Sequence, residues 1–252
     1  MKRACRHGKC RQALPVYRSD MLKAVIFDLD NTLYSYDKAH AAAYASVLTY
    51  AGQCLALSQE RFNALHAEAN RILSQRCGGG PAIHNRLIRF QIILELAGLP
   101  IGAAPEMANR YWTTLLDRME PEPGAAETLQ SLQSMGLRIG VGTNMTADWQ
   151  YEKLKRLGLL PRVGFLVTSE EINAEKPDLR LFDLCAEKAG ALPRECAFVG
   201  DSLQKDALAA CAAGMFGIWY RPGSVPEPPP ANVPVLKSLS ELPALLAANR
   251  LS

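Results

Sequence analysis

Several features that would place this chain in a specialised class are missing from its sequence. No apolar stretch approaches the roughly 20 residues that a membrane-spanning helix needs, so we expect no contact with a membrane. The net charge of +3 is small and the basic residues are scattered, which argues against a nucleic-acid surface. The seven cysteines are odd in number and lack metal-ligand spacing, and no secretory signal precedes them. They are typical of reduced thiols, so we expect a cytoplasmic protein.

Residues 1–20 lack the apolar residues and the periodicity found in the rest of the chain. They contain six lysines or arginines, which predicts a disordered basic tail. Cys5, His7 and Cys10 form an incomplete ligand set for a metal ion. A transit peptide is the other alternative, because the stretch is basic and nearly free of acidic residues.

From residue 120 onward, expected helices alternate with apolar strands. Helices are predicted over 125–135, 148–157, 178–189 and 203–213, and each is followed by, or ends near, a glycine that stops it. The stretches LRIGVGTN, GFLVTS, CAFVGDS and GIWY between and after them read as strands, and a short strand and a closing helix follow the proline-rich stretch. Such alternation is typical of βα units around a parallel sheet.

The segment 37–119 has a helical pattern with hardly any strand signal. Ser58 is placed to cap one helix, a second is expected over 84–97 and a third over 105–119. The sequence therefore predicts an α/β fold in which residues 21–36 and 120–252 form a Rossmann-like core with a parallel sheet. The segment 37–119 would be an all-helical domain inserted after the first strand.

Polar side chains follow the strands of this predicted sheet. Ligands of open parallel sheets collect at the carboxyl ends of the strands, and these residues stand at such ends. They are Asp28 and Asp30, Thr143 and Asn144, Lys176, and Asp201 with Asp206 five residues later. Each one alone has an ordinary structural explanation as a turn, a cap or a solvated side chain. Their occurrence in this order at successive strand ends favours a site.

This set of groups suits phosphoryl transfer. Clustered carboxylates repel each other unless a cation joins them, and oxygen ligands favour Mg²⁺. A cation and an ammonium would neutralise the charge on a phosphoryl group. One carboxylate can attack phosphorus as a nucleophile, while the second protonates the leaving oxygen and later activates water.

With these residues, the sequence resembles the haloacid dehalogenase superfamily in its phosphatase branch, from about residue 21 to 246. The four motifs of that family match FDLDNT (27–32), VGTN (141–144), EKPD (175–178) and VGDSLQKD (199–206). The helical insertion is similar to the α-helical cap of the family. One departure is Asn31, where many members have glycine; several nucleotidase-like and sialic-acid-phosphate phosphatase-like members share the asparagine.

The resemblance implies a role for each matched residue. Asp28 would be the nucleophile and Asp30 the general acid and base. Thr143 would bind the phosphoryl oxygens with Asn144 beside it, and Lys176 would balance the charge. The metal ligands would be Asp28, Asp201, the backbone carbonyl of Asp30, and Asp206 as a ligand or a neighbour of one.

The substrate is expected to be a small phosphorylated metabolite of the nucleotide or sugar phosphate type. Asp30 argues against a dehalogenase, because family dehalogenases lack this aspartate. A sugar-phosphate mutase and a non-catalytic module that binds a phosphometabolite remain alternatives. Arg86 and Arg89 are candidates for binding an anionic substrate, although a solvated helix face explains them equally well. We expect a monomer or a homodimer.

Overall fold

The computed structural model describes residues 22–78, 80–225, 230 and 233–248, so the predicted tail of residues 1–20 lies outside the described residues. Its centre is a six-stranded parallel sheet with the strand order β3-β2-β1-β4-β5-β6. The strands are β1 (Ala24–Phe27), β2 (Arg138–Thr143), β3 (Phe165–Thr168), β4 (Cys196–Gly200), β5 (Phe216–Tyr220) and β6 (Val235–Leu236). The prediction of a parallel α/β sheet is therefore confirmed.

Strand β1 lies between β2 and β4, and all four of its residues are buried. Because successive side chains of a strand point to opposite faces, Val25 and Phe27 join one apolar cluster while Ala24 and Ile26 join another. A strand that is apolar on both faces is what a covered parallel sheet requires. The central place of β1 puts the residues that follow it in the middle of one sheet edge.

Helices cover both faces of this sheet. The helices that follow the segment inserted after β1 are α5 (Ala125–Ser134), α6 (Ala147–Arg156), α7 (Ser169–Ile172), α8 (Leu179–Ala189), α9 (Ala209–Ala212) and α10 (Leu242–Ala248). The cluster that contains Phe27 includes side chains of α5, α6 and α10, and the cluster that contains Ile26 includes side chains of α8 and α9. This three-layer arrangement is typical of α/β folds.

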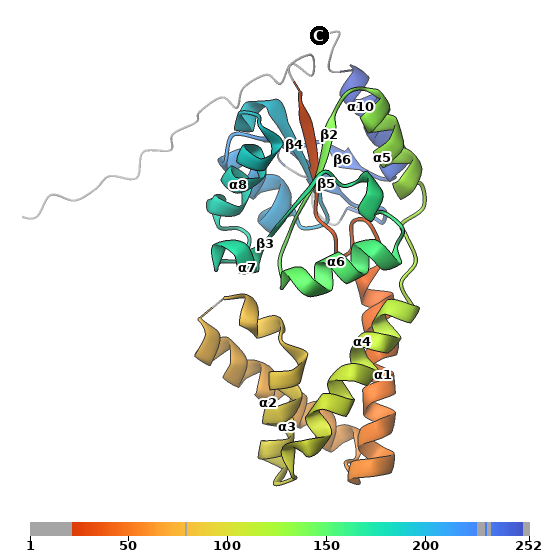
Figure 1. The fold of residues 1–252 in the computed structure, drawn as a ribbon, viewed down its shortest axis with the longest axis vertical. Coiled ribbons are helices and arrows are strands. Elements are labelled where there is room, and N and C mark those ends of the chain that lie inside the picture. Colours follow the sequence, from red (N-terminus) through yellow and green to blue (C-terminus); the bar gives the residue numbers. More distant parts are fainter. Residues whose placement is uncertain (1–21, 79, 226–229, 231–232, 249–252) are drawn as a thin grey trace, which may run out of the picture.

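Four helices between β1 and α5 form a helical module beyond one end of the sheet (Figure 1). They are α1 (Tyr36–Leu55), α2 (Gln59–Cys77), α3 (Arg86–Ala97) and α4 (Ala104–Asp117). Helices α1 and α4 run side by side, and α2 and α3 pack on each other (Figure 1). As predicted, Ser58 caps α2, where its Oγ accepts from the N–H of Arg61 at 3.2 Å.

One local prediction was wrong. The segment expected as one helix over 203–213 is a π-helical stretch, η6 (Leu203–Leu208), followed by the short α9. The helix expected over 178–189 is α8, whose N-cap is Asp178, and the Lys176–Pro177 peptide just before it is cis. Both features lie at the sheet edge that carries the candidate site, where irregular backbone is common.

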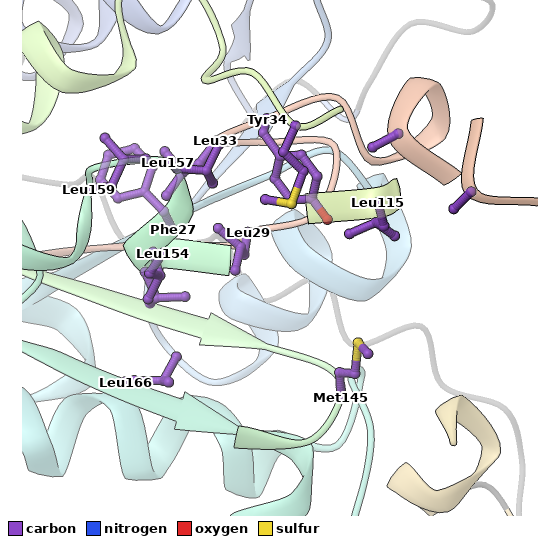
Figure 2. Close-up of a cluster of buried hydrophobic side chains, with 14 of the residues drawn as sticks. Phe27, Leu29, Leu33, Tyr34, Leu115, Met145, Leu154, Leu157, Leu159 and Leu166 are labelled. Atoms are coloured by element: carbon purple, nitrogen blue, oxygen red, sulfur yellow. The ribbon is translucent and has the colours of Figure 1, made fainter. Parts of the chain in front are cut away.

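Apolar side chains hold the loop after β1 in place. Figure 2 shows Phe27, Leu29 and Leu33 in one cluster with Leu154 and Leu157, which belong to α6 and its end. Phe27, Leu29 and Leu33 are fully buried, and they alternate with the polar residues of the loop. This packing fixes the backbone from which Asp28 and Asp30 project.

Within the described residues, no helix has the length and apolar character needed to cross a membrane.

Candidate active site

The loop after β1 carries the two aspartates of the first motif. The N–H of Asp28 donates to the carbonyl of Val199 at 2.8 Å, which continues the pairing of β1 with β4 by one residue. The Asp28 side chain is thereby held, almost entirely buried, at the carboxyl end of the sheet. Asp30 lies two residues further along the loop and lines the same cavity.

Asn31 has a structural reason for its place in this loop. Its φ of 58° lies in the left-handed region, which asparagine tolerates better than most residues other than glycine. Its Oδ1 also accepts from the N–H of Asp37 at 3.1 Å, in the first turn of α1. The departure from the more common glycine therefore keeps the backbone shape and adds a bond to the helical module.

Lys176 joins two of the carboxylates predicted for the site. Its Nζ lies 2.8 Å from Asp28 Oδ1 and 2.7 Å from Asp206 Oδ1, and it donates to the carbonyl of Gly142 at 3.3 Å. Burial alone would lower the pKa of Lys176, but Asp206 and Asp28 outweigh burial and hold this pKa above its ordinary value. Asp206 is itself oriented by the N–H of Ser202, which donates to its Oδ2 at 2.9 Å.

Three carboxylates form a cluster with a gap for a cation. Ligand atoms of Asp28, Asp201 and Asp206 all lie within 4.8 Å of one another. Burial raises the pKa of Asp28 to about 6, against the opposing charge of Lys176. Burial, followed by the charges of Asp28 and Asp206, raises the pKa of Asp201 to about 7. Burial is the main cause of both shifts, and the neighbouring carboxylates add to it; an all-oxygen donor set of this kind fits Mg²⁺.

The carboxylate of Asp30 is directed away from that cluster, toward α6. Lys153 Nζ donates to both of its oxygens, at 2.7 and 3.0 Å, and Tyr34 Oη and Gln150 Nε2 donate to it as well. Burial would raise the pKa of Asp30, but Lys153 and these hydrogen bonds hold it below its ordinary value. Any share of Asp30 in a metal site would therefore come from its backbone carbonyl, as the family resemblance implies.

Lys153 and Gln150 were missed by the sequence analysis, although the sequence carries a signal for them. Gln150, Lys153, Leu154 and Leu157 have the spacing of one helical face, and all four are buried. A lysine and a glutamine on the apolar face of a helix indicate polar partners in the interior, because burial without a partner is unfavourable. The partner is Asp30.

Thr143 and Asn144 stand at the end of β2, as predicted. The hydroxyl of Thr143 is buried, accepts from Gln150 Nε2 at 3.0 Å and lies 3.3 Å from the carbonyl of Asn144. The side chain of Asn144 is used to hold the neighbouring loop: its Oδ1 accepts from the N–H of Lys176 at 2.9 Å and its Nδ2 donates to Glu175 at 3.4 Å. Both residues line the cavity.

This cavity, of about 310 Å³, combines residues from the sheet edge with residues from the helical module. Those from the sheet edge and its loops are Asp28, Asp30, Asn31, Thr143, Asn144, Met145, Lys176, Asp201, Ser202, Lys205 and Asp206, and those from the helical module are Tyr36, His84 and Arg86. The structure therefore brings together eight of the nine predicted site residues. Arg89, the ninth, is half-buried on α3, donates to the carbonyl of Ile83 at 2.6 Å and is not among the residues that line the cavity.

Two contacts connect the helical module to the core beside the cavity. His84 Nε2 and Glu175 Oε1 lie 2.5 Å apart, which joins the turn before α3 to the loop that carries Lys176. The indole rings of Trp112 on α4 and Trp149 on α6 stack with their centroids 3.9 Å apart and 9° between their planes. Arg86 lines the same cavity as the four carboxylates.

Comparisons with known proteins identify the family of this chain. The family model described as haloacid dehalogenase-like hydrolase matches residues 22–214. A ribulose-1,5-bisphosphate 5-phosphatase from Halopiger xanaduensis is 37% identical over 205 residues, which cover 80% of this chain and 86% of that protein. A glyceraldehyde 3-phosphate phosphatase from Methanopyrus kandleri is 33% identical over 221 residues, 84% of this chain and 89% of that protein.

The fold also matches that of a solved protein. A 2-haloacid dehalogenase from Pseudomonas syringae superposes with a TM-score of 0.72 at 26% identity, over 90% of this chain and 99% of that one. Dehalogenase and phosphatase names thus occur on the same architecture, and the two curated relatives, at higher identity, are phosphatases. The chain belongs to the haloacid dehalogenase-like hydrolases and is a phosphoric monoester hydrolase of that superfamily.

Proposed function

We propose that this enzyme is a Mg²⁺-dependent phosphatase that hydrolyses a small phosphorylated metabolite, a sugar or nucleotide phosphate, through an aspartyl-phosphate on Asp28. The observation that carries the proposal is the position of Asp28, buried at the central strand end, 2.8 Å from Lys176 and in one cavity with Asp30 and Thr143. The names of the two relatives, which refer to phosphorylated sugars of three and five carbons, support a substrate of this size.

The residues that would hold Mg²⁺ are Asp28, Asp201, Asp206 and the backbone carbonyl of Asp30. The first three already lie within 4.8 Å of one another, and the raised pKa values of Asp28 and Asp201 are what uncompensated carboxylates produce. When bound, the ion would neutralise these carboxylates together with the oxygens of the phosphoryl group.

In the first half of the reaction, an oxygen of Asp28 attacks phosphorus and the bond from phosphorus to the ester oxygen breaks. Lys176 holds Asp28 in position and balances the added negative charge. The hydroxyl of Thr143 can turn from the carbonyl of Asn144, a weak contact of 3.3 Å, to a phosphoryl oxygen. In the free enzyme Asp30 is ionised, so it must take up a proton with the substrate, where the negative charge of the phosphoryl group beside it raises its pKa. Asp30 then gives this proton to the leaving oxygen, which departs as an alcohol.

In the second half, Asp30, now ionised, accepts a proton from water as that water attacks the phosphorus of the aspartyl-phosphate. The bond between Asp28 and phosphorus breaks, inorganic phosphate leaves, and Asp30 again carries a proton. The lowered pKa of Asp30 suits this half of the cycle, because Lys153 stabilises the ionised form that accepts the proton.

The helical module is proposed to act as the cap domain that covers the reaction. Its residues Tyr36, His84 and Arg86 line the cavity opposite the carboxylates. Exclusion of water by such a cover strengthens electrostatic interactions within the site and protects an acyl-phosphate from uncontrolled hydrolysis.

The test is Asp30→Asn, assayed with p-nitrophenyl phosphate and with an alkyl phosphate in the presence of Mg²⁺. The nitrophenolate needs little protonation to leave, so we expect a burst followed by a slow steady state, with phosphate covalently bound in the mass spectrum. The alkyl ester should react slowly from the first step. Asp28→Asn is the matched control, and its turnover should fall at least about a thousandfold on both substrates.

Wild-type turnover of the alkyl ester by Asp30→Asn would refute the role of Asp30. Full activity of the wild type after removal of divalent ions would refute the metal dependence. Conversion of a sugar phosphate into its isomer, instead of release of inorganic phosphate, would favour a mutase.

A further inference from the structure

Arg86 is a buried cation without an anionic partner. It is the first residue of α3, its exposed fraction is 6%, and its guanidinium lies 4.8 Å from the centre of the Tyr111 ring. It donates to the carbonyl of His84 at 2.9 Å and to the hydroxyls of Tyr36 and Tyr111 at 2.9 and 3.2 Å. Within the described part of the chain its acceptors are all neutral oxygens, and its Nε has no partner at all.

The surroundings of Arg86 add no negative charge. Its neighbour Arg89 is half-buried, and burial followed by the charge of Arg86 lowers the pKa of Arg89 to about 10. Burial, followed by the charges of Arg89 and Arg86, lowers the pKa of His66 to about 4, and burial and Arg86 lower that of His40 as well. These imidazoles are therefore neutral, and the interior of the helical module keeps an uncompensated positive charge at neutral pH.

A buried charge without a counter-ion is destabilising, so its presence calls for an explanation. The hydroxyls of Tyr36 on α1 and Tyr111 on α4 fix the plane of the guanidinium, and its Nε–H and one N–H of Nη1 are left without an acceptor among the described residues. Arg86 lines the cavity that contains Asp28. A planar guanidinium with fixed orientation is well suited to bind a carboxylate or a phosphate through paired hydrogen bonds.

The charges at the other end of the cavity cannot supply this anion. The four carboxylates Asp28, Asp30, Asp201 and Asp206 share this end of the cavity with three ammonium groups, those of Lys176, Lys153 and the exposed Lys205. With a bound Mg²⁺ this end would carry one net positive charge, which the phosphoryl group of a substrate would meet. A substrate with a single phosphate would therefore leave Arg86 unpaired.

We propose that Arg86 binds a second anionic group of the substrate, a phosphate or a carboxylate, so that the preferred substrates are short phosphomonoesters with two anionic groups. The proposal rests on the proposed phosphatase function. The cavity volume of about 310 Å³ lies at the small end of ligand pockets, which fits a short carbon skeleton that spans from Asp28 to Arg86.

The first test needs only the wild-type enzyme with Mg²⁺. Its kcat/KM is compared within two matched pairs: 3-phosphoglycerate against glycerol 3-phosphate, and ribulose 1,5-bisphosphate against ribulose 5-phosphate. We expect the member with the second anion to be preferred in at least one pair by on the order of 100-fold, the effect of paired charged hydrogen bonds in a buried site. The pair that shows the preference distinguishes a carboxylate from a phosphate.

The second test uses Arg86→Met, with Arg71→Met as the control that removes an exposed arginine from the same helical module. In Arg86→Met the kcat/KM of the preferred substrate should fall on the order of 100-fold more than that of p-nitrophenyl phosphate, mainly through a rise in KM. Arg86→Lys should restore part of the loss, because it returns the charge without the planar geometry. Arg71→Met should behave as the wild type on every substrate.

The possible failures are distinct. If the wild type shows no preference in either pair, the second-anion site is refuted, while Mg²⁺-dependent hydrolysis of p-nitrophenyl phosphate would still support the phosphatase. Equal losses of Arg86→Met on all substrates would make Arg86 a structural tie between α1, α3 and α4. Absence of any Mg²⁺-dependent phosphatase activity would instead refute the proposed function itself.

Discussion

The ion pair of Lys153 with Asp30 offers a quantitative test of how the acid and base residue is held. The side chain of Lys153 is fully buried and that of Asp30 is 26% exposed. Lys153→Met removes the charge and keeps an unbranched stem of similar length. Tyr34 and Gln150 still donate to the carboxylate in this variant, but no cation remains beside it.

Loss of one member of a buried ion pair costs about 3–5 kcal/mol of unfolding free energy. Asp30 keeps two hydrogen-bond donors and part of its access to water, so we expect Lys153→Met to lower the unfolding free energy by about 2–3 kcal/mol at pH 8, the low end of this range or slightly less. In the wild type the pKa of Asp30 is lowered, so its ionised form stabilises the fold above the unfolded pKa, and this contribution is lost as the pH falls through the folded pKa.

The variant should reverse the direction of that pKa shift. Without Lys153, only the hydrogen bonds from Tyr34 and Gln150 oppose burial, so we expect the pKa of Asp30 to rise above its unfolded value. At pH 5 the carboxyl then takes up a proton on folding, so the difference from the wild type should be smaller than at pH 8 by about 1 kcal/mol or more. A destabilisation that is the same at both pH values would contradict this account.

Urea unfolding of the metal-free protein, followed by tryptophan fluorescence, measures these differences. Combination with Asp30→Asn in a double-mutant cycle isolates the pair, and we expect the double variant to lose about 2 kcal/mol less than the sum of the two single variants at pH 8. Lys155→Met, on the same helix but 70% exposed, is the control and should change stability by less than about 0.5 kcal/mol. Additive single effects would show that Lys153 does not hold Asp30.

Two further predictions concern the metal and the core. Because the pKa values of Asp28 and Asp201 are raised, the metal-free protein should lose stability as the pH rises from about 4 to 7. Mg²⁺ should therefore raise the melting temperature more at pH 8 than at pH 5.5. Scanning calorimetry measures this difference, and Asp201→Ala should abolish it. Gly142→Ala on β2 would place a Cβ 2.8 Å from Cys185 Sγ and 2.9 Å from Phe198, so we expect a loss of about 1–3 kcal/mol in urea unfolding, and an unchanged midpoint would show that the helix layer shifts freely.

The sheet edge that carries the candidate site was predictable because it depends on topology. Once the strands are parallel, residues that follow different strands meet at one edge regardless of their separation in sequence. Asp28, Thr143, Lys176 and Asp201 are therefore placed correctly by alternation of strands and helices alone. The geometry of Asp206 was harder to predict, because the sequence LQKDAL carries no signature of the π-helical turn that buries this residue.

The environment of Arg86 could not be predicted from the sequence, for a different reason. An arginine in the first turn of a helix is normally exposed, and its burial here results from tyrosines of α1 and α4, distant in sequence by 50 and 25 residues. Local periodicity carries no information on such partners. For the same reason the sequence could not distinguish Arg86 from Arg89 as a binding residue, whereas in the structure only Arg86 of the two lines the cavity.

The contact between His84 and Glu175 would couple substrate entry to charge placement if the helical module opens. Glu175 also accepts from Asn144, whose Oδ1 in turn accepts from the backbone N–H of Lys176. If the helical module moved away to admit a substrate, the bond from His84 to Glu175 would break, and the loop that carries Lys176 would lose one of its supports. The proposed nucleophile Asp28 would then meet its full complement of positive charge only after the substrate has been enclosed. A ligand too large to allow that enclosure would be bound at the sheet edge and released unchanged, so selection by size would act on the rate of phosphoryl transfer as well as on affinity.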